Sequence, residues 1–83
     1  MAGNFSTSVG TSSTLLLAAN GSRASATICN DSAQLVYLNF GTSAIIGRGI
    51  RLNPGGDFIE TTTVLDIYAI AVATGSQVCG SWA

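Results

Sequence analysis

The alternation of apolar and polar positions predicts short strands along most of this chain. From Thr14 onward, brief apolar runs are separated by turn signals about every 8 to 12 residues, a spacing typical of all-β folds. No stretch of useful length has the i, i+3, i+4 apolar spacing of a helix. The sequence therefore predicts an all-β domain over residues 14–83, a small antiparallel β-sandwich or jelly-roll-like barrel.

Three segments have a clear strand pattern. Residues 23–30 and 35–40 alternate, which predicts half-buried strands with one apolar face each. Residues 66–73, "DIYAIAVA", are apolar enough to be buried on both faces, as in a central strand. The apolar positions that share one face are Ala24, Ala26 and Ile28 in the first segment and Val36, Leu38 and Phe40 in the second.

Residues 47–60, "GRGIRLNPGGDFIE", hold two of the three Arg and four of the ten Gly. The alternation around Arg51 predicts a strand, and residues 53–56 are typical of a hairpin turn because Pro presets φ and Gly permits positive φ. The glycines on either side of Arg48 indicate a bulge or a close backbone approach. A phosphate-binding loop would need a helix directly after the glycines, and no helical pattern follows here.

The first thirteen residues differ from the rest. Residues 1–13 are rich in Ser, Thr and Gly, and Phe5 and Val9 are their only large apolar side chains. This composition predicts a flexible or partner-ordered N-terminal arm that is dispensable for the fold.

The composition points to contacts with other protein. Charged residues make up 8% of the 83 residues, Lys and His are absent, and the formal net charge is −1. A free monomer usually needs more charge to stay dispersed, so we expect much of this surface to face other subunits. The charge balance gives no reason to expect nucleic acid or an anionic membrane as a partner. We also expect no secretory signal, because the start lacks a basic segment followed by an apolar run.

The candidate chemistry is sparse. Without His there is no Ser-His or Cys-His nucleophile pair, and two Cys alone cannot complete a zinc site. The carboxylates of Asp31, Asp57, Glu60 and Asp66 offer at most an acid pair, and Asp31 and Asp57 occur in turn-like segments. We therefore expect no enzymatic activity and no metal or cofactor.

Two cysteines leave a redox question open. Cys29 and Cys79 both fall in expected strands, and a disulfide is possible if those strands are neighbours on one face. The alternative is a pair of free thiols, which a reducing cytosol favours.

Several side chains are candidates for subunit contacts. Arginine is preferred over lysine at interfaces, and Arg23, Arg48 and Arg51 could pair with acids of a neighbour. Trp82, one residue from the end, suits either an interface anchor or a core position. The full set of interface candidates is Phe5, Val9, Tyr37, Arg48, Arg51 and Trp82.

The stretch "LLLAANGSRASATICNDSAQLVYLNFG" resembles a group of small tailed-phage virion proteins. Their pattern reads approximately L-L-x-A-N-x-x-R, a strand ending in Asn, V-Y-x-x-F-G, a G-I-x-L-x-P-G hairpin and an I-Y-A-I-A strand. The resemblance covers about residues 15–80, and the arm lies outside it. The chain departs from the pattern at Gly21, where Pro is frequent, and in having Cys29, Cys79 and Trp82. The matching positions are Leu16, Leu17, Ala19, Asn20, Arg23, Asn30, Val36, Tyr37, Phe40, Gly41, Gly49, Ile50, Leu52, Pro54, Gly55 and Ile67 to Ala71.

The resemblance implies a structural virion protein on a phage particle. The expected function is that of a head-decoration (cement) protein, a homotrimer on the capsid surface that is made in the host cytoplasm. Its partners would be sister subunits and the major capsid protein or another virion protein. The alternative is a head-fibre or tail accessory domain that binds a receptor or carbohydrate. Aromatic side chains on an exposed loop would support that alternative, and Tyr37 and Trp82 are the candidates.

Overall fold

In a computed structural model that describes residues 3–83, the chain forms eight strands and no helix. The all-β prediction is confirmed, and the strands form two separate sheets and not a closed barrel. None of the described residues belongs to a helix long and apolar enough to cross a membrane. The strands are β1 (Gly3–Val9), β2 (Thr14–Leu17), β3 (Ala26–Asn30), β4 (Val36–Phe40), β5 (Ile50–Leu52), β6 (Phe58–Thr61), β7 (Ile67–Ala71) and β8 (Ser76–Trp82).

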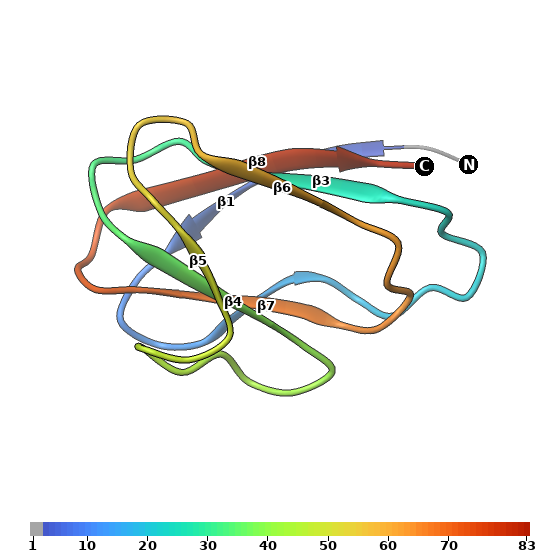
Figure 1. Ribbon diagram of the computed structural model, residues 1–83, viewed down its shortest axis with the longest axis horizontal. Helices are drawn as coiled ribbons and strands as arrows, with labels where there is room; N and C mark the ends of the chain where they lie inside the picture. The colour runs from blue at the N-terminus through green and yellow to red at the C-terminus, as the bar shows by residue number, and fades with distance from the viewer. Residues whose placement is uncertain (1–2) are drawn as a thin grey trace.

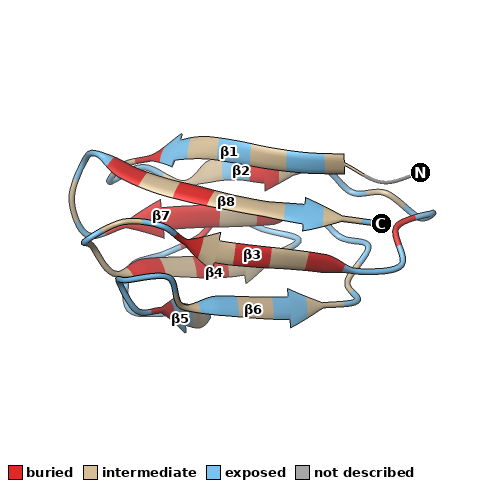
Figure 2. Ribbon diagram, turned by 90° about the horizontal axis from the view of Figure 1, so that it is seen from above, coloured by how far each residue is buried: buried red, intermediate tan, exposed pale blue. Residues whose placement is uncertain are grey.

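The two sheets pack face to face as a sandwich. Sheet A has the strand order β1-β8-β3-β6, and sheet B has the order β2-β7-β4-β5, with antiparallel pairing throughout. Sheet A lies over sheet B when the molecule is seen from above (Figure 2). The chain passes from one sheet to the other at every connection except the one between β4 and β5, so the sheets are interlocked (Figure 1).

The core lies between the sheets, where the inward positions of each strand meet. The expected alternation is confirmed, because Ile28 and Leu38 are fully buried and Phe40 packs against them at the edge of the core. Ala24 precedes the start of β3 and is exposed, so the alternation of buried positions begins at Ala26 and not at Ala24. Strand β7 is central in sheet B, as predicted, and its inward face is fully buried, but on its outward side Tyr68 is only half-buried and Val72, just after the strand, is 41% exposed. The buried apolar residues of the main cluster are Val9, Leu16, Ala26, Ile28, Val36, Leu38, Leu52, Ile67, Ala69, Ala71 and Val78.

The structure corrects the prediction of an N-terminal arm. Gly3–Val9 forms the edge strand β1 and pairs with β8 along its whole length. Phe5 and Val9 lie on its inward side, and Val9 is only 1% exposed. Apolar side chains at alternate positions are enough to fix an edge strand, because the Ser and Asn residues between them face solvent. Residues 1–2 of the expected arm lie outside the described residues.

The structure also corrects the predicted hairpin at residues 53–56. The turn is present, with φ of +89° at Gly55 and +98° at Gly56. However, β5 pairs with β4 in sheet B and β6 pairs with β3 in sheet A. The turn therefore carries the chain from one sheet to the other and does not join neighbouring strands.

A buried amide explains this crossing. Asn30 ends β3 and is fully buried, and its Nδ2 donates to the carbonyl oxygens of Gln34, Leu52 and Asn53 at 2.7, 3.0 and 3.1 Å. Its Oδ1 accepts a hydrogen bond of 2.6 Å from the hydroxyl of Ser32. A buried amide is costly unless its donor and acceptor groups are all bonded. These hydrogen bonds therefore hold the β3–β4 and β5–β6 connections against the end of β3.

The placement of β1 can be tested with Val9→Ala. We expect a loss of about 2–3 kcal/mol in the free energy of unfolding, because the change removes buried methyl groups and leaves a cavity. The matched control Ser8→Ala changes the neighbouring outward position and should stay within about 0.5 kcal/mol. Urea unfolding measures both variants. Equal, negligible effects would mean that residues 3–9 do not belong to the core.

Candidate interaction surface

Three of the predicted interface residues belong to the core and are not exposed anchors. Phe5, Val9 and Trp82 all point inward from sheet A and pack against the buried cluster. The indole of Trp82 lies against Gly3, and the ring of Phe5 lies against Gly80, so each aromatic covers a position without a side chain. The alternative of a core position for Trp82 is therefore the one that the structure supports.

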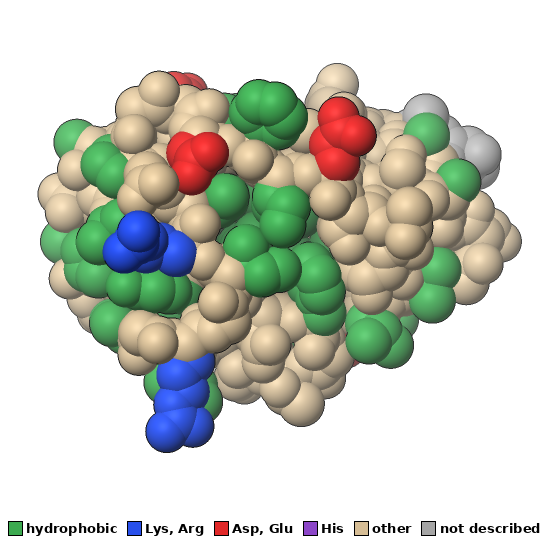
Figure 3. Space-filling view, in the orientation of Figure 1, with side chains coloured by type: hydrophobic (Ala, Val, Ile, Leu, Met, Phe, Trp, Pro, Cys, Tyr) green, Lys and Arg blue, Asp and Glu red, His purple; other side chains and the backbone are tan. Residues whose placement is uncertain are grey.

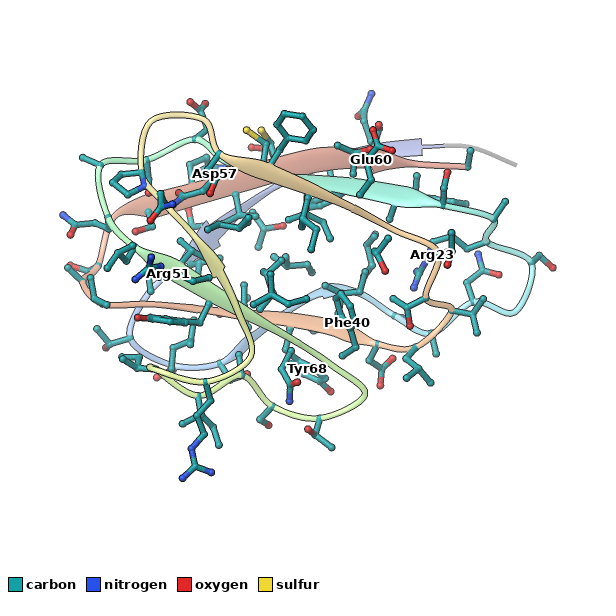
Figure 4. The ribbon with its side chains drawn as sticks, in the orientation of Figure 1. Arg23, Phe40, Arg51, Asp57, Glu60 and Tyr68 are labelled. Atoms are coloured by element: carbon teal, nitrogen blue, oxygen red, sulfur yellow. The ribbon has the colours of Figure 1, made fainter. Side chains whose placement is uncertain are left out.

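Arg23 is also not available to a partner. Its side chain is 4% exposed, and Nε and Nη2 donate to the carbonyl oxygen of Thr63 at 3.2 and 3.1 Å. Nη1 donates to the carbonyl oxygen of Ala18 at 3.1 Å, and Nη2 also donates to that of Leu65 at 2.7 Å. The guanidinium thus joins the β2–β3 and β6–β7 connections at one end of the sandwich (Figure 4). This role replaces the expected contact with a neighbouring subunit.

Arg51 and Tyr37 lie on the solvent side of sheet B, and Arg48 is exposed in the loop that follows β4. The pairing register places Tyr37 between Ile70 of β7 and Arg51 of β5, with all three side chains on the outward face. On the same face, Tyr68 of β7 lies opposite Leu15 of β2, which is 45% exposed. Figure 4 shows Tyr68 on the side of β7 that faces away from sheet A.

A loop covers part of this face. Residues 41–49 run below β4 and β7 in Figure 1, and the Ala44 N–H donates to Ser13 Oγ at 2.9 Å, just before β2. Ala44 is 4% exposed and the outward-facing Ile70 is 8% exposed, as expected if the loop shields this part of the sheet. The tip presents Ile45 and Ile46 to solvent, 53% and 45% exposed.

We call this surface the sheet B face. Among the described residues, seven large apolar side chains are exposed, and four of them lie here. A free, isolated domain gains nothing from such a concentration, and exposed apolar patches commonly mark protein interaction sites. The pairing of β4 and β7 continues for one residue, because the Val72 N–H donates to the Leu35 carbonyl oxygen, so Val72 follows Tyr68 and Ile70 on the outward side. The sheet B face, together with the loop over it, consists of Leu15, Tyr37, Ile45, Ile46, Arg48, Arg51, Tyr68 and Val72.

Two of the acids lie apart from Arg51, whereas Asp66 lies beside the start of β7 in sheet B. Arg51 lies with sheet B, whereas Asp57 and Glu60 lie with sheet A (Figure 4). In the space-filling view the basic and acidic groups accordingly occupy different parts of the surface (Figure 3). The sheet B face therefore combines apolar area with guanidinium groups, a combination common in the cores of protein interfaces.

A hollow lies on another part of the described surface. A shallow hollow of about 430 Å³ is lined by Ser25, Glu60, Thr61 and Thr62. Glu60 is the one ionisable side chain among these four lining residues. Within residues 3–83, no three Cys, Asp or Glu side chains gather as metal ligands would.

The two cysteines are brought together. Cys29 of β3 and Cys79 of β8 are directly opposite each other in the register of sheet A, and both are half-buried free thiols. The sequence analysis made a disulfide conditional on the two cysteines lying on neighbouring strands and on one face. The structure meets that condition, and both thiols are free in it.

Sequence reasoning missed Ile45, Ile46 and Tyr68 as surface residues. The sequence pattern did not single out the two isoleucines, and Tyr68 fell within the segment that was expected to be buried on both faces. The available signal was the pair of glycines after Ile46, because Gly47 and Gly49 both have positive φ, which a regular strand does not tolerate.

In comparisons with known proteins, no protein-family model matches the chain and no curated protein matches it at a significant level.

The two kinds of arginine can be separated by alanine substitution. We expect Arg23→Ala to lower the free energy of unfolding by about 3 kcal/mol, because it leaves several buried carbonyl groups without a donor. Arg51→Ala removes an exposed side chain and should cost no more than about 0.5 kcal/mol. Thermal or urea unfolding measures both. If Arg51→Ala were the more damaging change, the assignment of Arg23 as a structural tie would be wrong.

The return of the loop into β5 depends on Gly49. This residue has a φ of +84°, and a Cβ here would meet the carbonyl oxygen of Leu38. Gly47 has a φ of +86° but open space around it, so Gly47→Ala is the matched control for backbone strain alone. We expect Gly47→Ala to cost about 1–2 kcal/mol and Gly49→Ala clearly more. Similar losses in chemical unfolding would show that the close approach is unimportant.

Proposed function

We propose that the protein acts by assembly, as a structural virion protein that decorates and stabilises a phage head. The observation that carries the assembly role is the sheet B face, which presents Ile45 and Ile46 on a loop held against the sheet. The low content of charged residues supports the same role, because it leaves little electrostatic repulsion between neighbouring copies of the protein.

One copy of the sheet B face supplies a weak contact, and several copies in an oligomer would bind more tightly together. Covering an exposed Ile or Leu side chain stabilises a complex by about 1–2 kcal/mol. A trimer that binds a symmetric shell makes several such contacts at once, and linked contacts raise the overall affinity far above that of one subunit. Because only the assembled shell is bound, decoration stabilises that state by mass action.

The choice of a phage head rests on the resemblance over residues 15–80. Two of the matching residues, Arg23 and Asn30, are buried and hydrogen-bond to loop carbonyl oxygens at opposite ends of the sandwich. The shared pattern therefore includes residues that hold this fold together. The alternative of a receptor-binding fibre or tail domain called for aromatic side chains on an exposed loop. Trp82 lies in the core and Tyr37 on a strand, so decoration is the function we propose.

The assembly role can be tested by sedimentation velocity at micromolar concentration. We expect the purified protein to form a discrete oligomer, a trimer, and the double variant Ile45→Asp/Ile46→Asp to sediment as a smaller species. The matched control Val64→Asp places a charge at an exposed apolar position of another loop, 40% exposed, and should leave the oligomer intact. A wild-type protein that remains a monomer throughout would contradict the proposal.

The place on the particle needs a separate measurement. Cryo-electron microscopy of particles that carry the protein should show copies that follow the symmetry of the capsid. A few copies at one vertex would instead favour a fibre or tail role, and absence from the particle would refute the virion assignment while leaving the oligomer result unaffected.

A further inference from the structure

Cys29 and Cys79 form a cross-strand pair in the middle of sheet A. Along one row of the sheet, Ser6 of β1 is opposite Cys79, Cys79 is opposite Cys29, and Cys29 is opposite Phe58 of β6. Both side chains lie on the outer face of this sheet, because the neighbouring Ile28 and Val78 are fully buried on its inner face.

The backbone at this pair suits a disulfide. Residues directly opposite each other on antiparallel strands have Cα atoms about 4.5–5.5 Å apart, which lies inside the range of about 4.4–6.8 Å for disulfides. Both thiols are half-buried on an outward face, so a small reagent can reach them. The neighbouring Phe58 is 59% exposed and does not seal the site.

We propose that Cys29 and Cys79 are a redox site, at which a small-molecule disulfide of the glutathione type closes a reversible bond between β3 and β8. In the first step, one cysteine thiolate attacks a sulfur of the reagent, which forms a mixed disulfide and releases one reagent thiolate. In the second step, the other cysteine thiolate attacks the protein sulfur of that mixed disulfide and releases the second thiolate. The cysteines lose two electrons and two protons, which the two released reagent thiols carry away.

The bond would act on the connection that holds sheet A together. Strand β8 pairs with both β1 and β3, so linking β8 to β3 fixes the central pair of the sheet. The linked positions, 29 and 79, are fifty residues apart in the sequence (79 − 29 = 50). A bond across so long a segment restricts the unfolded chain strongly, which raises the stability of the folded form.

The surroundings of the pair set the conditions for its oxidation. Burial raises the pKa of the Cys29 thiol, and Cys79 and the carboxylates of Asp31 and Asp57 raise it further. Glu60, on the same face of β6 as Phe58, adds another negative charge nearby. Because the thiolate is the attacking species, disulfide formation should be slow at neutral pH and accelerate by up to about tenfold per pH unit while the pH remains below that pKa.

The test uses the full-length reduced protein and oxidised glutathione as the probe. After incubation at pH 7 and pH 8, the sample is quenched with acid and analysed by intact mass and peptide mapping. We expect a mass loss of two hydrogen atoms, a Cys29–Cys79 linked peptide, and faster formation at pH 8. We also expect the Tm of the oxidised form to be about 8 °C or more above that of the reduced form.

The single variants Cys29→Ser and Cys79→Ser are the matched controls. Each should form only a glutathione adduct, and oxidant should not produce the same rise in Tm. Stable glutathione adducts on both cysteines of the wild-type protein, disulfide-linked dimers, or an oxidised form no more stable than the reduced one would each overturn the proposal. None of these outcomes depends on where the protein assembles.

Discussion

The pairing of β8 between β1 and β3 is the interaction on which the rest of sheet A depends. The last strand of the chain must be in place before the first strand, Gly3–Val9, has a partner. The same pairing directs Trp82 and Val78 into the core and places Cys79 opposite Cys29 on the other side. Because β1 is an edge strand whose one partner is β8, this pairing couples segments that are far apart in the sequence.

The two outer faces of the sandwich differ in chemistry because the strands carry different residues at their outward positions. On sheet A the outward residues of β1 and β8 are Asn, Ser, Gln and Cys, which solvent tolerates well. On sheet B the outward residues include tyrosines, Ile70 and Leu15, and the loop of residues 41–49 adds Ile45 and Ile46. Sheet A also exposes a large apolar side chain, Phe58 of β6, but exposed apolar residues are more numerous on the sheet B side, which supports the assembly proposal.

Much of the fold could be predicted from local pattern, but the pairing between distant strands could not. Alternation correctly predicted the inward faces around Ile28 and Leu38, and the positive φ at Gly55 and Gly56 follows from their turn sequence. The partners of β5 and β6 could not be predicted, because the buried amide of Asn30 decides the crossing and its acceptors lie in other loops. The composition of residues 1–13 likewise predicted an arm. Strand β1 is held by its pairing with β8, which local composition does not reveal.

Arg23 shows the corresponding limit for the candidate site. Charge and residue type suggested a contact with a partner, but the guanidinium is buried and donates to the carbonyl oxygen of Thr63, 40 residues further along the chain. The sheet B face could not be predicted, because it depends on strand pairing that places Leu15, Tyr68 and Arg51 on one side of the sheet. It also depends on the loop of residues 41–49, which has no regular apolar pattern. The surface is thus a product of the tertiary structure and not of any one sequence segment.

Hydroxyl-radical footprinting of the assembled protein against its dissociated subunit tests the central claim most directly, because it measures the solvent exposure of individual side chains. The account predicts that Ile45, Ile46 and Leu15 become protected on assembly, while Phe58 on sheet A stays equally reactive in both states. Protection of Phe58 together with unchanged reactivity of Ile45 and Ile46 would contradict the assignment of the sheet B face as the contact surface.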